Sequence, residues 1–229
     1  MGTQRLGVLG GTFNPIHEGH LHIARSVQEL FALTKILFVV ASTPPHKPQE
    51  NLIELTHRYA MVSLATAEEP SFIPSLVELE PDVSPYSVDT MRKIARNFDQ
   101  DSGEIYFIAG GDSLRDVTSW RESDELLTVY NFIFVLRPGI DVRNFEDFLP
   151  EKVQTRVCDC TGADRSYVKN RIEEAHSGTN RLFVLNINAP DISATKIREQ
   201  IASGENPGDS LPDPVHEYIK KLQLYGVTK

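Results

Sequence analysis

A glycine-rich turn that carries two histidines, GGTFNPIHEGH at residues 10–20, directly follows the apolar run Leu6–Leu9. Glycines let backbone amides approach a ligand closely, and a helix beginning near Gly19 presents further amides that no helical carbonyl can pair. Amide donors at a helix start suit an anion such as phosphate. The spacing fits neither the P-loop nor the complete dinucleotide pattern of glycines. The turn therefore predicts an anion site of another kind.

His17 and His20 are candidate donors to phosphate oxygens, because imidazoles at a helix start add little fixed charge. Two other roles are open on residue type alone. The pair could cap the loop structurally, or the two could bind zinc together with His22. The zinc alternative needs a carboxylate or cysteine partner that the local sequence does not supply at a recognised spacing.

The segment ISATKIR at residues 192–198 predicts a second helix start. Ser193 suits the N-cap position, and Lys196 and Arg198 would bring cationic donors to a nearby anion. A capped helix with basic residues is common, so a purely structural role is the alternative.

The segment GGDSLRDVTSW at residues 110–120 follows the apolar run 105–108. Gly110 and Gly111 would open space for a flat ligand, and Asp112 could accept hydrogen bonds from ribose hydroxyls. The alternatives are that Asp112 caps a helix and that Trp120 fills the core. Because ligands of doubly wound folds bind at the carboxyl ends of the strands, this placement favours a ligand contact.

Short apolar runs rich in Val, Ile and Phe alternate with helical patterns along the chain, which predicts an α/β fold. The expected architecture is a Rossmann-like, doubly wound, mainly parallel sheet with helices on both faces and a small C-terminal helical part. The expected strands are Leu6–Leu9, Ile36–Val40, Ile105–Ile108, Phe132–Leu136 and Leu182–Leu185, with a short extended piece near Phe72–Leu79. The expected helices are His20–Leu33, Leu55–Ala67, Ser87–Phe98, Thr195–Ala202 and Val215–Leu224.

Length and composition indicate one domain over residues 1–229, with an insertion at 141–179, partly helical around Tyr167–Ala175, and C-terminal helices within 193–225. A net charge of −9 argues against a broad cationic surface for nucleic acid. No apolar run approaches the length of a membrane span. Cys158 and Cys160 are too close for an ordinary disulfide framework and too few for a structural zinc site. We therefore expect a cytoplasmic protein without a nucleic-acid or membrane partner.

Three strand-end segments with glycine, hydroxyl and basic residues would meet at one edge of the sheet, which predicts a nucleotide site. No Ser-His-acid or cysteine nucleophile pattern stands out, so positioning and electrostatics are better candidates for catalysis than a covalent intermediate.

Seven segments in order resemble those of the bacterial nicotinate-nucleotide adenylyltransferases, within the nucleotidyltransferases that share a T/H-x-G-H signature. They are GGTFNPIHEGH, VASTPPHK (40–47), HRYAMVSLA (57–65), SPYSVDTM (84–91), GGDSL followed by Trp120, ISATKIR, and LPDPVHEYIKKLQLY (211–225). The resemblance covers nearly the whole chain. It implies that ATP and nicotinate mononucleotide react to give deamido-NAD and pyrophosphate, with Mg²⁺ held mainly by ATP phosphates and water, and it leaves a homo-oligomer open.

The resemblance also implies roles for individual residues. The triphosphate would meet His17, His20, the amides of Gly11, Thr12 and Phe13, and, from the other side, Ser193 and Arg198. Lys47 would reach the reacting phosphates, which makes His17, His20, Lys47 and Arg198 the expected catalytic set. Adenosine would contact Gly110 and Asp112, the pyridine ring would stack on Trp120, and backbone amides near Tyr86 and Ser87 would meet the nicotinate carboxylate. No protein residue is expected to ligate a metal.

Two positions depart from the family pattern. Asn14 stands where many members carry aspartate, and Arg121 stands where some place an aromatic residue beside the pyridine. The rival functions are another adenylyltransferase of the superfamily, such as the phosphopantetheine enzyme, and a regulator that binds nucleotide without catalysis.

Overall fold

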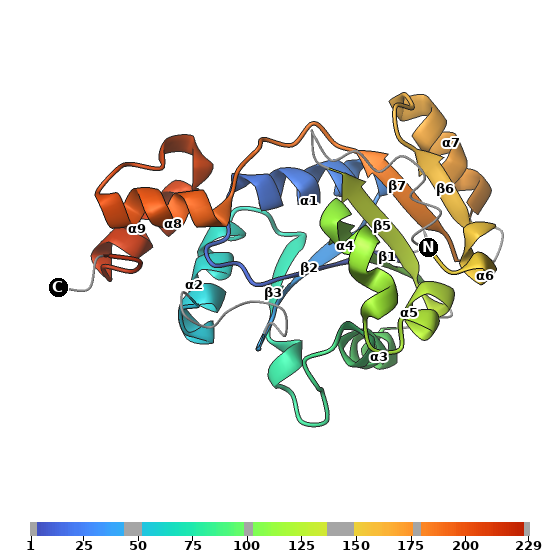
Figure 1. Cartoon of the computed structure of the whole chain (residues 1–229), viewed down its shortest axis with the longest axis horizontal. Helices are drawn as coiled ribbons and strands as arrows, with labels where there is room; N and C mark the ends of the chain where they lie inside the picture. Colours follow the sequence, from blue (N-terminus) through green and yellow to red (C-terminus); the bar gives the residue numbers. More distant parts are fainter. Residues whose placement is uncertain (1–3, 44–51, 99–102, 137–148, 176–179, 227–229) are drawn as a thin grey trace.

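A parallel sheet forms the centre of the protein (Figure 1). The computed structural model describes residues 4–43, 52–98, 103–136, 149–175 and 180–226. Its seven strands lie in the order β3-β2-β1-β4-β5-β7-β6, and every neighbouring pair is parallel. The strands are β1 (Gln4–Gly11), β2 (Lys35–Val40), β3 (Phe72–Ser75), β4 (Gly103–Gly110), β5 (Asn131–Leu136), β6 (Val157–Cys160) and β7 (Leu182–Asn186). The expected doubly wound α/β fold is confirmed.

Helices cover both faces of this sheet. They are α1 (Glu18–Phe31), α2 (Leu55–Ala65), α3 (Ser87–Asn97), α4 (Gly111–Asp116), α5 (Ser123–Val129), α6 (Glu151–Gln154), α7 (Arg165–Ala175), α8 (Ala194–Ser203) and α9 (Asp213–Lys221). Short 3-10 helices are η2 (Val77–Leu79), η3 (Val117–Ser119) and η5 (Gly208–Ser210). In the described part of the chain, no helix has both the length and the apolar character needed to cross a membrane.

Alternation along the strands assigns each side chain to one of two cores. In β4, Tyr106 and Ile108 pack on the face covered by α1, α2, α7, α8 and α9, whereas Phe107 and Ala109 pack on the face covered by α3, α4, α5 and α6. Successive side chains of a strand point to opposite faces, so a strand covered on both sides must be apolar throughout. All six residues of β5 are buried, and the five that follow Asn131 appear in the sequence as an unbroken apolar run.

Two parts of the chain differ from the sequence expectation. The extended piece expected near Phe72–Leu79 is a strand only to Ser75, and then becomes the 3-10 helix η2. The segment 141–179 contains the expected helix α7 and also strand β6, which pairs with β7 at the edge of the sheet. Strand β6 was not predicted because its residues, VCDC, include an exposed aspartate and form no apolar run.

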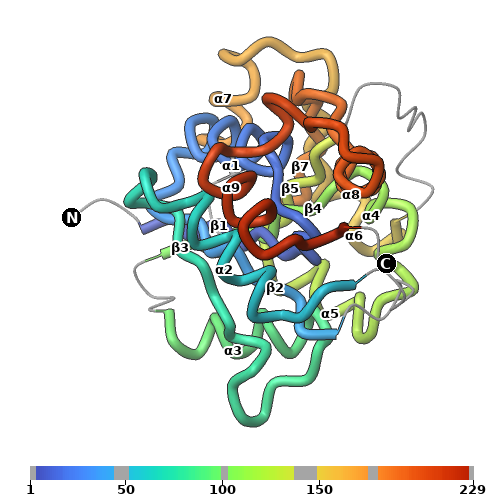
Figure 2. Tube along the Cα trace, turned by 90° about the vertical axis from the view of Figure 1, so that its left-hand side faces the viewer, coloured from blue at the N-terminus to red at the C-terminus, as the bar shows by residue number. Residues whose placement is uncertain are grey.

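The topology fixes where a ligand can bind. Strand β1 lies between β2 and β4; α1 leaves β1 on one face of the sheet, while α3, which precedes β4, covers the opposite face. Connections that diverge in this way leave a crevice at the carboxyl ends of the two strands. The helices α8 and α9 lie at one end of the molecule (Figure 1), where α9 packs beside α2, and Figure 2 looks at the molecule from that end.

Candidate active site

A cleft of about 620 Å³ opens at the carboxyl ends of β1 and β4. Its lining combines backbone of the glycine-rich turn with aromatic and hydroxyl side chains. It is lined by Gly10, Gly11, Thr12, Ala41, Thr43, Glu78, Pro85, Tyr86, Ser87, Phe107, Ile108, Ala109, Gly110, Ser113, Ser119, Trp120 and Arg121. The cleft therefore lies where the topology places a ligand.

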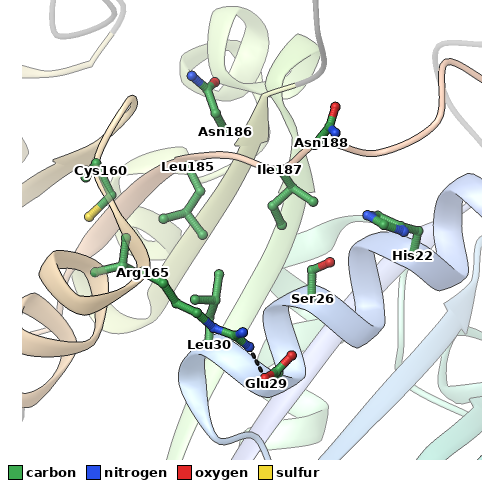
Figure 3. A pocket seen from close by; sticks show the side chains of 12 residues that line it. His22, Ser26, Glu29, Leu30, Cys160, Arg165, Leu185, Asn186, Ile187 and Asn188 are labelled. Carbon is green, nitrogen blue, oxygen red and sulfur yellow. Dashed lines mark ion pairs between the residues drawn. The ribbon is translucent and has the colours of Figure 1, made fainter.

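A second cavity, of about 580 Å³, lies between α1, α7 and the end of β7 (Figure 3). His22 and Ser26 of α1 face it, and the ion pair between Arg165 and Glu29 joins α7 to α1 beside it. Burial raises the pKa of the Cys160 thiol in its wall to about 11, so this thiol is protonated at neutral pH.

The start of α1 holds its two histidines face to face. Their rings stack with centroids 3.7 Å apart, and Phe13 meets the His20 ring edge-on at 5.1 Å. The backbone N–H of His17 donates to Nδ1 of His20 at 3.2 Å, which leaves the proton of a neutral His20 on Nε2. The donor proton of a neutral His20 thus lies on Nε2, and the stacked His17 ring is only 2% exposed.

The zinc alternative for these histidines has no support in the geometry. His22 lines the second cavity (Figure 3). Among the residues that the structure describes, no group of three His, Cys, Asp or Glu side chains could hold a metal ion.

Close packing explains one glycine of the turn. A Cβ on Gly11 would lie 2.7 Å from Cζ of Phe13, whose backbone is left-handed with φ of 48°. The Phe13 side chain is buried, so any contact of Phe13 with a ligand would be through its backbone, and the predicted amide contact stays a prediction.

The two glycines after β4 have different roles. A Cβ on Gly110 would meet no atom within 4 Å, so this position faces the open cleft as expected. A Cβ on Gly111 would lie 2.8 Å from Cδ2 of Leu136, so Gly111 allows α4 to pack on β5 and opens no space. The alternative that Asp112 caps α4 is wrong, because Gly110 is the N-cap residue and Asp112 is exposed in the first turn.

Arg198 and Asn14 join α8 to the glycine-rich turn. Nη1 of Arg198 donates to the Asn14 carbonyl at 2.8 Å, and Tyr225 donates its hydroxyl to Oδ1 of Asn14 at 2.8 Å. Ser193 is the N-cap of α8, where its hydroxyl accepts from the backbone N–H of Lys196. The start of α8 is thus held beside the start of α1. Asn14, a departure from the family pattern, is 8% exposed and acts here as a structural link.

Removing the Tyr225 hydroxyl tests this link. Burial raises the pKa of Tyr225, so the phenol is protonated at neutral pH and can donate. We expect Tyr225→Phe to lower the free energy of unfolding by about 1–2 kcal/mol, because it leaves Asn14 without this donor, and to raise the KM for ATP. Urea unfolding and steady-state kinetics measure both. Tyr167→Phe is the control because Tyr167 is exposed, and a Tyr225→Phe protein equal to that control would contradict the link.

Arg58 of α2 is a site residue to which the sequence analysis gave no role. It is 1% exposed, and its guanidinium donates to the carbonyls of Thr12 at 2.9 Å and Ala41 at 2.7 Å, and also to those of Ser42 and Ile53. Burial lowers the pKa of Arg58, although the group remains a cation. An arginine on the apolar face of α2 is the sequence signal that could have identified it.

Glu78 holds the same loop from the cleft side. Its carboxylate accepts from the backbone N–H of Ser42 at 2.8 Å, from the Ser42 hydroxyl and from the hydroxyl of Thr90. Arg58 and Glu78 therefore fix the residues just before the PPHK segment. Lys47 in that segment lies outside the described residues.

The far wall of the cleft is aromatic and charged. Trp120 meets Phe107 edge-on at 6.0 Å, so it packs on the core and also lines the cleft. Cζ of Arg121 lies 4.9 Å from the centroid of the Tyr86 ring. Tyr86 is the N-cap residue of α3 and Ser87 is its first residue, so both predicted backbone contacts lie at a helix start on the cleft wall.

The predicted residues fall into two adjoining groups. Gly11, Thr12, Gly110, Tyr86, Ser87 and Trp120 line the cleft. His17, His20, Phe13, Ser193 and Arg198 surround the starts of α1 and α8, which the hydrogen bond from Arg198 to Asn14 ties to the same turn. Asp112 is exposed in the first turn of α4 and does not line the cleft.

Known proteins share this sequence and fold. Residues 8–200 match the family model described as cytidylyltransferase-like. A probable nicotinate-nucleotide adenylyltransferase of Citrifermentans bemidjiense is 36% identical over 96% of this chain and 98% of its own length. One of Geobacter metallireducens is 37% identical with the same coverage. The solved structure of Plasmodium falciparum nicotinic acid mononucleotide adenylyltransferase complexed with NaAD has a TM-score of 0.68, 17% identity and 97% coverage of both chains, which shows a shared fold. The chain therefore belongs to the cytidylyltransferase-like family, and within it to the nicotinate-nucleotide adenylyltransferases.

Proposed function

We propose that this protein transfers the adenylyl group of ATP to nicotinate mononucleotide, giving deamido-NAD and pyrophosphate in NAD biosynthesis. The observation that carries the proposal is the cleft at the carboxyl ends of β1 and β4, which continues the glycine-rich turn into an aromatic wall. Phosphate groups fit the turn, and a flat pyridine ring fits Trp120. The relatives that are about 36% identical bear the name of this activity.

The reaction needs no enzyme-bound intermediate. An oxygen of the 5′-phosphate of nicotinate mononucleotide attacks the α-phosphorus of ATP, the bond from that phosphorus to the bridging oxygen breaks, and pyrophosphate leaves. Such a transfer depends on positioning and on stabilising negative charge. We assign these tasks to Nε2 of His20, the amides of the turn, and the cations Arg198 and Lys47, with Ser193 at the start of α8.

The family resemblance implies the residue assignments that we propose for the nucleosides, and the cleft geometry bears on each of them. Gly110 faces open cleft and can approach the adenosine, while Asp112, outside the cleft lining, would have to reach it from the exposed side of α4. The pyridine ring would stack on Trp120. Backbone amides at the start of α3 would meet the nicotinate carboxylate, which accepts two donors better than a carboxamide does.

Mg²⁺ would reach the site together with ATP. Among the described residues, no group of three His, Cys, Asp or Glu side chains could hold a metal ion. We propose that phosphate oxygens and water hold the ion, where it would offset negative charge. The positioning roles proposed for His20, Arg198 and Lys47 do not depend on a metal ion bound by the protein.

The state of the two cysteines supports a cellular location for the protein. Cys158 and Cys160 are free and buried, as expected for a protein of the reducing cytoplasm, and we propose that location. A homo-oligomer stays a prediction.

Pyrophosphate release tests the function directly. We expect turnover when ATP and Mg²⁺ are mixed with nicotinate mononucleotide, a lower kcat/KM with nicotinamide mononucleotide, and none with phosphopantetheine. The carboxylate donors at the start of α3 are the reason for the preference. Turnover with phosphopantetheine alone would replace the proposal by the rival adenylyltransferase. Nucleotide binding without pyrophosphate from any acceptor would replace it by the regulator.

A further inference from the structure

Arg121 is the one cation among the described residues that line the cleft. It follows Trp120 and lies over the ring of Tyr86, with Cζ 4.9 Å from the ring centroid. A guanidinium over an aromatic face is attracted by the ring and keeps a defined orientation. This cation is therefore held at the aromatic wall of the cleft, on the side that would receive the ring of the acceptor.

Two carboxylates hold Arg121 without saturating it. Nη1 lies 3.8 Å from Oδ2 of Asp89, and Nε lies 3.4 Å from Oε1 of Glu122. Both distances exceed the roughly 2.7–2.9 Å of a strong charge-assisted hydrogen bond. The side chain is 50% exposed, so its remaining N–H groups can reach a ligand. Arg92 lies closer to the same two carboxylates than Arg121 does. Because Asp89 and Glu122 already pair with Arg92, they neutralise the charge of Arg121 only in part.

The chemistry of the acceptor decides which of its groups can reach Arg121. Transfer requires the 5′-phosphate at the glycine-rich turn, so the pyridine ring must extend toward Trp120. Nicotinate carries a carboxylate on that ring, whereas nicotinamide carries a neutral carboxamide. An arginine beside the ring adds attraction to the first ligand and none of similar size to the second, because only the carboxylate is charged and the carboxamide offers one neutral carbonyl oxygen.

We propose that Arg121 is a specificity-determining residue that favours an acceptor with an anionic ring substituent over its neutral amide. This rests on the proposed function and adds a side-chain charge to the backbone donors at the start of α3. Substituting Arg121 should therefore remove part of the preference for nicotinate mononucleotide over nicotinamide mononucleotide.

The test compares three variants with both acceptors, by pyrophosphate release at saturating ATP and Mg²⁺. Arg121→Gln should lower kcat/KM for nicotinate mononucleotide about tenfold, mainly through KM, and change that for nicotinamide mononucleotide less than twofold. Arg121→Lys should fall between, since it keeps the charge and loses the planar fork. Arg96→Gln, which removes the same charge from an exposed position at the other end of α3, should leave the preference unchanged.

The outcomes separate this inference from the proposed function. If the unmodified protein prefers nicotinate mononucleotide and Arg121→Gln keeps that preference, or loses activity equally with both acceptors, the role of Arg121 is refuted and the function stands. If the unmodified protein releases no pyrophosphate with nicotinate mononucleotide, the proposed function fails. A fall in preference in Arg121→Gln but not in Arg96→Gln supports the inference.

Discussion

Replacing His20 by alanine is expected to lower kcat about 10²–10³-fold while lowering the free energy of unfolding by only about 1 kcal/mol. The geometry gives the reason. The backbone N–H of His17 occupies Nδ1 of His20, so Nε2 carries the proton that would stabilise charge on the transferring phosphate. The alanine variant loses this donor and a contact at the helix start, but the core remains. Steady-state pyrophosphate release and urea unfolding measure the two effects.

Two further variants separate catalysis from folding. His20→Asn offers an acceptor for the His17 N–H together with a donor, so it should retain more activity than alanine. His22 lies on the same helix but lines the second cavity (Figure 3). The kcat/KM of His22→Ala should therefore stay near that of the unmodified protein. A folded His20→Ala protein with unchanged kcat would remove His20 from the mechanism.

The largest expected effect on stability is that of Arg58→Met. Arg58 is 1% exposed and supplies donors to backbone carbonyls at the ends of two strands, including those of Thr12 and Ala41. Methionine fills similar space but leaves these carbonyls without a donor. We expect the free energy of unfolding to fall by about 3–5 kcal/mol, measured by urea denaturation.

The matched control is Arg25→Met on α1. Arg25 pairs with Glu18 and Glu69, but its side chain is 48% exposed, so the substitution should cost less than about 1 kcal/mol. Arg58→Lys should give an intermediate loss, because one ammonium cannot reproduce the planar fork. If Arg58→Met were no less stable than Arg25→Met, the carbonyl contacts would be structurally unimportant.

The sequence predicted the central strands well because burial on both faces leaves a visible pattern. The expected strands Ile36–Val40, Phe132–Leu136 and Leu182–Leu185 are apolar throughout. The observed strands β2, β5 and β7 each differ from them by one residue at one end. Strand β6 is different. Among the described strands it pairs only with β7, and its Asp159 is exposed, so its sequence contains no apolar run that would predict a strand.

Local sequence was enough to predict the open position of Gly110 after a strand and the N-cap position of Ser193 at a helix start. The site was not predictable where the partner is a carbonyl distant in sequence. Arg58 looks like an isolated charge in an apolar helix until the fold brings four carbonyls around it. Gly111 similarly resembles a ligand-facing glycine, but Leu136 of the neighbouring strand determines its role.

The hydrogen bond from Tyr225 to Asn14 joins residues 211 positions apart. A contact between such distant positions closes a very long loop and is expected to form late in folding. During synthesis, the turn after β1 leaves the ribosome early but lacks its partner until Tyr225 has also emerged. A nascent chain halted before that point would have the glycine-rich turn without the tyrosine that anchors Asn14. The turn should therefore reach its full stability only after the chain has emerged as far as Tyr225.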